Sequence, residues 1–293
     1  MLTNKKYIAV VCHDAGAANI IISWLNPYKL KNYKILMEGP GKKLFREKYK
    51  KISLIKSIDD VLDGVEALIV GTGYQSDLEF NAIKKAKIKK IKTIAILDHW
   101  VNYKSRFVRK NKKILPDEIW ITDKFALQLA KKYFPKIKIR LKLNKYINEQ
   151  IKCISQFKPN KKIHKILYLL EPINNSWNRN TLGEFQALDF FISKLNILNL
   201  PKNFMIVLRL HPSEKKNKYN KWITMQENKY QISIDSNQHL YKSIGNANSI
   251  FGCQTLALVI SVKAGKETFC TLPPWAPDSK IPYKKIKLLK NLK

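Results

Sequence analysis

The sequence predicts an α/β protein made of two Rossmann-like domains that face each other across a cleft. Short apolar runs of strand length alternate with segments of helical spacing along all 293 residues. Polar residues follow several of these runs directly, as expected at the carboxyl ends of parallel strands. A polar, lysine-rich segment near residues 150–163 divides the pattern into halves. We therefore predict domains at residues 1–155 and 162–293.

Composition excludes several classes of protein. Hydrophobic residues make up 45% of the chain, enough for sizeable cores, and no run of 18 apolar residues predicts a transmembrane helix. The first apolar run, residues 7–11, is too short for a signal peptide, which predicts a cytoplasmic protein. The four cysteines are scattered without a C-x-x-C pair, so we expect reduced thiols and no metal site.

The net charge of +33 would attract polyanions, including nucleic acid, anionic membranes and acidic substrates. The lysines are spread along the whole chain together with many Ile and Asn residues, a composition typical of an AT-rich genome. No helix-turn-helix, zinc-finger or RNP signature accompanies the charge. We therefore expect a mainly solvated surface charge, and a basic nucleic-acid-binding protein remains an alternative.

The first half contains six predicted strands, each a short apolar run that ends at a turn or polar residues. They cover residues 7–11, 34–37, 67–70, 93–97, 118–122 and 137–143. Helical spacing follows at residues 20–25 and 125–133, and Asp123 is the predicted N-cap of the second of these helices. Residues 38–42 lack the phosphate-loop pattern and are predicted to form a turn.

The turn after the first predicted strand combines two chemical groups with small residues. His13 and Asp14 precede Gly16 and Asn19 at the start of a helix. Small residues at this position allow a ligand to approach backbone N–H groups at the positive end of the helix. Close packing of helix on strand would select the same small residues, but it would not select His13 and Asp14.

Two further strand ends in the first half carry polar groups. Gly71, Thr72 and Gly73 follow one strand in an incomplete dinucleotide-binding pattern, and we assign them to the acceptor side of the site. Asp98 and His99 follow the next strand, where a carboxylate beside an imidazole is a candidate acid–base pair. The alternative is a turn aspartate with a capping histidine.

The second half repeats the alternation of strands and helices. Predicted strands cover residues 165–170, 204–210, 231–234, 249–251 and 268–271, and predicted helices cover residues 185–195 and 240–246. The basic tail, residues 281–293, is predicted to be a terminal helix that packs on its own domain or lies on a membrane surface.

The strongest candidate for anion binding is the stretch of residues 206–214, in which Arg209, His211 and Pro212 end a buried strand. Arginine offers a planar fork for phosphate, and histidine donates hydrogen bonds or carries a proton. The alternative is that Arg209 pairs with a carboxylate and His211 caps a turn.

A second anion site is predicted where Gly252, Gln254 and Thr255 open a helix, because a hydroxyl and free N–H groups occur together there. Thr255 could instead be an ordinary N-cap. Glu171 lies in the exit loop of the strand at residues 165–170, and we assign it to the cleft.

The two-domain plan resembles that of GT-B glycosyltransferases. His211-Pro212 followed by the Gly-Cys-Gln-Thr helix start is similar to motifs of the bacterial sialyltransferases, polysialyltransferases and related Kdo transferases of capsule synthesis. The resemblance implies that His211 and Thr255 bind the phosphate of a CMP-activated sugar in the second domain. It also implies that Asp98 is the general base of an inverting transfer. Gln254 stands where the family has a hydroxyl residue, and His99 departs from its acidic motif.

The function predicted from the sequence is therefore transfer of a sugar, such as a nonulosonic acid, from a nucleotide-sugar to a surface glycan or lipid-linked acceptor. The first domain would bind the acceptor, no cofactor would be needed, and the enzyme could touch the inner membrane face. We rank Asp98 first as the base and Asp14 second, followed by His13 and His99. A UDP-sugar 2-epimerase of the same plan and a catalytically inactive sugar-binding relative are competing hypotheses.

Overall fold

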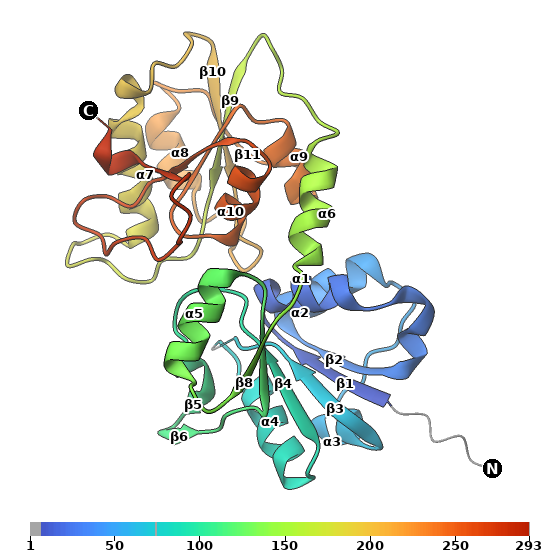
Figure 1. Cartoon of the computed structure of the whole chain (residues 1–293). Helices are drawn as coiled ribbons and strands as arrows, with labels where there is room; N and C mark the ends of the chain where they lie inside the picture. The colour runs from blue at the N-terminus through green and yellow to red at the C-terminus, as the bar shows by residue number, and fades with distance from the viewer. Residues whose placement is uncertain (1–6, 74, 293) are drawn as a thin grey trace. The chain divides into compact units, whose positions relative to one another are not determined.

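Two parallel sheets organise the chain, one in each of two units, Met1–Tyr146 and Ile147–Lys293 (Figure 1). The computed structural model describes residues 7–73 and 75–292. Each sheet has six strands with helices in the connections, since parallel neighbours need a crossover. The predicted fold class, two Rossmann-like α/β domains, is confirmed.

The sheet of the first unit has the strand order β2-β1-β3-β4-β7-β8. Its strands are β1 (Tyr7–Cys12), β2 (Tyr33–Met37), β3 (Val65–Val70), β4 (Lys92–Ile96), β7 (Glu118–Ile121) and β8 (Lys138–Leu141). A small antiparallel ribbon joins β5 (Val108–Arg109) to β6 (Lys112–Lys113). All six strands predicted in the first half are present.

The helices of the first unit connect these strands. They are α1 (Ala15–Trp24), α2 (Gly39–Lys48), α3 (Ile58–Leu62), α4 (Leu78–Ile88) and α5 (Lys124–Tyr133), with 3₁₀ turns η1 (Pro27–Asn32) and η2 (Ser105–Phe107). Helix α1 is apolar and packs into the core through Ala17, Ile20 and Ile21. Asp123 is the N-cap of α5, as predicted, and accepts a hydrogen bond from the Ala126 N–H.

The sheet of the second unit has the order β11-β10-β9-β12-β13-β14. Its strands are β9 (His164–Leu169), β10 (Phe204–Arg209), β11 (Ile232–Ile234), β12 (Ser249–Gly252), β13 (Glu267–Cys270) and β14 (Lys287–Leu288). Its helices are α6 (Lys145–Ile154), which begins at the unit boundary, α7 (Gly183–Ser193), α8 (Asn220–Gln226), α9 (Leu240–Gly245) and α10 (Leu256–Lys263), with 3₁₀ turns η3 (Leu195–Leu198) and η4 (Leu289–Asn291).

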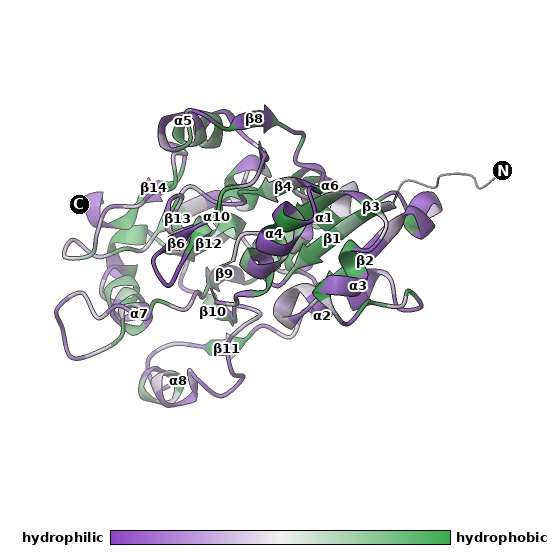
Figure 2. Cartoon of the chain, turned by 90° about the horizontal axis from the view of Figure 1, so that it is seen from below, coloured by the Kyte–Doolittle hydropathy of each residue, from purple (hydrophilic) through white to green (hydrophobic). Residues whose placement is uncertain are grey.

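Burial explains the hydropathy of the strands. The inner strand β1 and the edge strand β2 are hydrophobic, whereas β8 at the opposite edge is hydrophilic (Figure 2). In β8, Lys138 and Arg140 are exposed, whereas the last four residues of β1 are all buried. Among the described residues, no helix combines the length and the hydropathy needed to cross a bilayer.

Two predicted elements differ from the structure. The sequence predicts a turn at residues 38–42, but helix α2 begins at Gly39, which adopts a φ of +48° that favours glycine. The sequence also predicts a helical tail, but the tail forms β14 and a 3₁₀ turn instead. Ile286 and Leu289 are buried in the second unit, so these apolar side chains are not available to a membrane surface.

Strand order places one switch point in each sheet, where successive connections leave in opposite directions. In the first unit, β1 lies between β2 and β3. In the second unit, β9 lies between β10 and β12, and Leu169 is in register with both Arg209 and Gly252. Ligands of open α/β sheets bind beyond the strand ends at such points, and the predicted site residues follow these strands.

Candidate active site

The first cluster lies at the carboxyl ends of β1, β3 and β4 and contains three carboxylates and an arginine. Asp98 follows β4, and its Oδ1 accepts a hydrogen bond from Arg106 Nη1 at 2.6 Å. Both side chains are only 9% exposed. Arg106 Nη1 also donates to Thr72 Oγ1 at 2.9 Å, so Thr72 supports the ion pair.

The small residues of the cluster make room for carboxylates. A Cβ atom at Gly16 would overlap Asp98 Oδ2, so Asp98 lies directly against the first turn of α1. A Cβ atom at Gly73 would come within 2.9 Å of Asp14 Cβ, and one at Gly71 within 2.7 Å of Cys12 Sγ. The predicted acceptor glycines therefore pack against the protein's own side chains. Asn19, half-buried, lies further along α1.

Asp14 and Asp98 have different electrostatic environments. Burial, followed by the negative charge of Asp98, raises the pKa of Asp14 to about 6, although Arg106 opposes this shift. Burial also acts to raise the pKa of Asp98, but the adjoining Arg106 and His99 outweigh it and leave that pKa lowered. Asp14 therefore titrates near neutral pH, while Asp98 remains ionised beside Arg106.

Glu79 is a member of the cluster that the sequence did not reveal. It lies on the first turn of α4, its side chain is 2% exposed, and its Oε1 accepts a hydrogen bond from the His13 N–H at 2.8 Å. Burial raises its pKa to about 7. Glu79 Oε2 is buried without a hydrogen-bond partner among the described residues. An acidic residue just after the Gly-Thr-Gly loop is the one signal that the sequence offers for it.

The two histidine rings of the first unit pack against different neighbours. The His13 ring packs against Gly39, where a Cβ atom would overlap it, and the His13 carbonyl accepts from the Gly41 N–H at 2.8 Å. The His99 ring lies 5.0 Å from the Trp100 ring. Asp98 and His99, predicted as an acid–base pair, are thus joined electrostatically, while the hydrogen bond of Asp98 goes to Arg106.

Substitution of Glu79 tests the cost of burying this carboxylate. The pKa of Glu79 is higher in the folded state than its ordinary value, so its ionisation destabilises the fold as pH rises from about 4.5 to about 7. We expect Glu79→Gln to gain stability relative to the wild type across this window, by up to about 3 kcal/mol. Urea unfolding at pH 5 and pH 8 measures the change. A stability difference that is independent of pH would contradict it.

In the second unit, His211 is held in a defined orientation. His211 Nδ1 lies 3.3 Å from the Ser213 N–H, which can only donate, and 2.7 Å from Ser213 Oγ. Nδ1 is therefore the acceptor, and in the neutral ring the proton is on Nε2. Burial lowers the pKa of His211, which favours this neutral form. The ring can thus donate one hydrogen bond from Nε2, and Pro212 is an exposed turn residue beyond the end of β10.

The turn that carries His211 is fixed by a buried network. Its backbone N–H donates to Glu214 Oε2 at 3.2 Å. Glu214 Oε1 accepts from the Tyr219 hydroxyl at 2.6 Å and from Lys218 Nζ at 2.7 Å. The Glu214 side chain is 2% exposed, so the turn is anchored to the protein interior.

Arg209 has protein partners in place of the predicted phosphate. Its Nη1 donates to Asp235 Oδ2 at 2.5 Å and to Ser243 Oγ at 2.9 Å. Further bonds reach the carbonyls of Asn237 and Gln238. This geometry agrees with the alternative interpretation of Arg209, in which its guanidinium pairs with a carboxylate. Arg209 thereby connects the end of β10 to the loop before α9.

Glu171 and the start of α10 form one arrangement at the second switch point. Both carboxylate oxygens of Glu171 accept from the Gln254 N–H at 3.0 Å, and burial raises the pKa of Glu171 to about 7. Gly252 lies so close to the Leu169 carbonyl that a Cβ atom would approach it to 2.9 Å. Thr255 is the N-cap of α10 and accepts from the Ala257 N–H at 3.3 Å. Glu171 thus lies with the predicted donor residues.

Comparison with solved structures identifies the same fold in two UDP-N-acetylglucosamine 2-epimerases and in a glycotransferase. UDP-GlcNAc 2-epimerase from Methanocaldococcus jannaschii aligns with a TM-score of 0.57 and 11% identity over 90% of this chain and 83% of the other. Another UDP-N-acetylglucosamine 2-epimerase aligns with a TM-score of 0.53 and 10% identity over 90% and 78% of the two chains. The glycotransferase of kitacinnamycin aligns at 0.53 and 11% identity over 98% and 87%.

These similarities establish the GT-B-like fold, with two Rossmann-like domains. No protein-family model and no curated protein sequence matches the chain.

Proposed function

We propose that the protein transfers a sugar from a nucleotide-sugar to an acceptor hydroxyl. The observation that carries this proposal is a half-buried carboxylate, Asp14, whose pKa is raised to about 6 and which follows β1 at the switch point of the first sheet. A general base is most effective when its pKa lies near the working pH. The fold and the UDP-N-acetylglucosamine 2-epimerases among its structural neighbours support a nucleotide-sugar as the donor.

In the proposed reaction, Asp14 accepts the proton of the acceptor hydroxyl while that oxygen bonds to the anomeric carbon. The bond between the anomeric carbon and the phosphate oxygen breaks, and the nucleotide leaves with its phosphate. In the second unit, His211 Nε2 would donate a hydrogen bond to the nucleotide phosphate. The charges of the Asp98–Arg106 ion pair would adjust the pKa of Asp14, because Asp98 raises that pKa and Arg106 lowers it.

This assignment changes the order of the two carboxylates. The family resemblance ranks Asp98 as the base, but its ion pair with Arg106 occupies the carboxylate and lowers its pKa. A lowered pKa makes a carboxylate a weaker proton acceptor. Asp14 makes no side-chain capping bond on α1, and its raised pKa makes it the stronger proton acceptor of the two carboxylates.

The proposed function is tested by nucleotide binding, with a thermal-shift panel of CMP, CDP, UDP and GDP followed by calorimetry. We expect at least one of them to bind, since the second unit offers donors for phosphate. Nucleotide-sugars of the binding base are then assayed for transfer or slow hydrolysis. Failure of all four nucleotides to bind would contradict the proposal, and tight duplex binding at physiological salt would favour a nucleic-acid function.

His211→Ala should weaken binding of the nucleotide found in the panel by about 1.5–3 kcal/mol, the range for a hydrogen bond to a charged group. Calorimetry measures the loss. Ser213→Ala is the matched control, because it removes the hydroxyl contact with Nδ1 but keeps the backbone N–H that fixes the ring. Equal nucleotide affinity in His211→Ala and the wild type would remove His211 from the site.

A 2-epimerase activity is the second candidate, and Glu79 is the observation that favours it. Epimerisation needs groups that remove and return a proton at a sugar carbon, and Glu79 joins Asp14 as a second carboxylate that titrates near neutral pH. Incubation of UDP-N-acetylglucosamine in D₂O distinguishes the two. Deuterium at C2 of the recovered sugar would support epimerisation, and its absence alongside transfer would support the transferase.

A further inference from the structure

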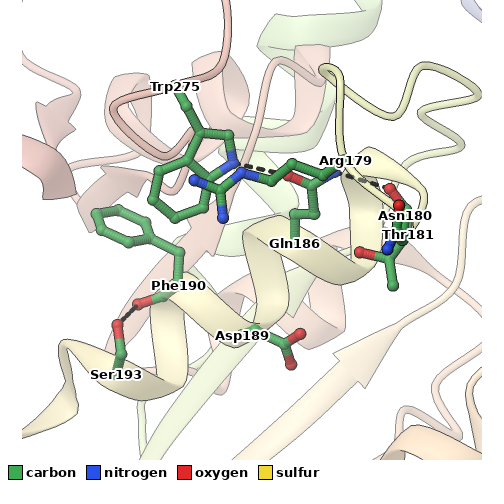
Figure 3. A pocket seen from close by; sticks show the side chains of 8 residues that line it. All are labelled: Arg179, Asn180, Thr181, Gln186, Asp189, Phe190, Ser193 and Trp275. Atoms are coloured by element: carbon green, nitrogen blue, oxygen red, sulfur yellow. Dashed lines mark hydrogen bonds between the residues drawn. The ribbon is translucent and has the colours of Figure 1, made fainter.

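A pocket in the second unit lies over one face of α7 and has no role in the proposed reaction. Its volume is about 520 Å³, which suits a small ligand of one or two rings. Figure 3 shows its lining, which comes from α7, the loop before it and the loop after β13. The lining residues are Arg179, Asn180, Thr181, Gln186, Asp189, Phe190, Ser193 and Trp275.

The walls of the pocket are joined by hydrogen bonds of one buried side chain. Gln186, 5% exposed, accepts from Trp275 Nε1 at 2.6 Å. Its Nε2 donates to the carbonyls of Ser176 at 2.5 Å and Thr181 at 2.7 Å. Gln186 thus fixes both loops against α7, so the pocket is formed before any ligand arrives.

Arg179 presents a free guanidinium over an aromatic ring. Its guanidinium carbon lies 3.8 Å from the centroid of the ring of Trp275, a residue that is 40% exposed (Figure 3). Its side chain forms no hydrogen bond or ion pair with any other residue in 7–73 or 75–292. Stacking holds the guanidinium plane in place, which lowers the entropy lost when its N–H donors bind a carboxylate or phosphate.

The rest of the lining suits a hydroxylated ring. Phe190 packs edge-on against Trp275, with ring centroids 5.9 Å apart, and the two give an apolar face. Asp189, Asn180 and Thr181 are exposed and offer acceptors and donors for hydroxyl groups. The Asp189 carboxylate is oriented by the Trp222 Nε1–H, which donates to Oδ1 at 2.7 Å. The same lining thus holds a carboxylate that can accept from hydroxyls and a guanidinium that can bind an anion, which fits a sugar with one acidic group.

We propose that this pocket is a binding subsite for an acidic saccharide, a pyranose that carries a carboxylate or a phosphate. Arg179 binds the acidic group, the Trp275 and Phe190 rings contact the sugar face, and Asp189 accepts from sugar hydroxyls. The subsite does not depend on the proposed transfer, since its groups are separate from Asp14 and His211.

The test is direct binding to the full chain, measured by calorimetry and ligand-observed NMR, with glucuronic acid, glucose 6-phosphate, glucose and inorganic phosphate. We expect one or both acidic sugars to bind at least about ten times more tightly than glucose or phosphate alone. The carboxylate and phosphate arms show which acidic group is preferred. Binding of glucose or inorganic phosphate as tight as that of the acidic sugars, or no binding of any probe at millimolar concentration, would overturn the proposal.

Variants locate the site. Arg179→Gln and Trp275→Ala should each weaken binding of the preferred acidic sugar about tenfold or more, with the folded state checked by the melting temperature. Lys194→Gln is the charge-matched control, because Lys194 lies over the Phe190 ring at 6.0 Å and is not part of the pocket lining. Unchanged affinity in Arg179→Gln, or an equal loss in Lys194→Gln, would overturn the assignment. His211→Ala should keep full acidic-sugar affinity.

Discussion

Asp14→Asn is expected to lower turnover of the proposed transfer by about 10²–10⁴-fold, the usual cost of losing a general base. Asparagine keeps the shape of the side chain but cannot accept the proton of the acceptor hydroxyl. In the wild type, kcat/KM should rise with pH through about 6, where Asp14 loses its proton. The variant should lack this acidic limb, while nucleotide binding, measured by calorimetry, stays at the wild-type level.

Asp59→Asn is the matched control for this experiment. Asp59 is an exposed carboxylate of the same unit whose ion pair with Lys85 lies on the surface, where such pairs contribute little. Its loss should leave turnover and the pH profile unchanged. Near-full turnover in Asp14→Asn would exclude Asp14 as the base, and an equal loss of nucleotide binding would indicate a structural role.

Asp98→Asn should have the largest effect on stability, because it breaks a buried ion pair and leaves Arg106 charged and unpaired. Both side chains are 9% exposed, and removal of one partner of such a pair costs about 3–5 kcal/mol. Urea unfolding measures this loss. The substitution also removes a negative charge that raises the pKa of Asp14, so the acidic limb of kcat/KM should move below about 6.

Arg106→Gln provides the opposing case. The positive charge of Arg106 lowers the pKa of Asp14, so its removal should move the acidic limb to higher pH. The pair of variants should therefore shift the profile in opposite directions while both lose stability. Shifts in the same direction, or none, would show that the Asp98–Arg106 pair does not set the charge state of Asp14.

The strand ends were predictable because local pattern determines them. Apolar runs located all six strands of the first sheet, and polar residues directly after them identified Asp14, Asp98 and His211. Parallel pairing then brings strand ends to one edge whatever the details of packing. The N-cap at Asp123 was also predicted, and the N-cap at Thr255 corresponds to the alternative weighed against anion binding, since capping depends on nearby residues.

The partners of these residues could not be predicted, because they come from distant or irregular segments. Glu79 reaches the His13 N–H across 66 residues of sequence, and Arg106 lies in the short 3₁₀ turn η2, which no extended periodic pattern indicates. The prediction of a turn at residues 38–42 was wrong because Gly39, in the left-handed region, allows a helix to begin where Gly and Pro usually signal a turn. The three-dimensional structure was therefore needed to learn that Asp98 is paired with Arg106 and that the pKa of Asp14 is raised.

The edge strand β8 has a consequence for the protein at high concentration. An exposed sheet edge offers unpaired backbone groups that can pair with another chain and begin aggregation. Leu141 and Leu143, at the end of β8 and just after it, are 47% and 66% exposed and would favour such pairing. Lys138 places positive charge along the same edge, so two copies that approach edge to edge repel each other, whereas the charge of Arg140 is paired with Glu118. Part of the lysine excess thus acts as protection against self-association, a role that high salt would weaken.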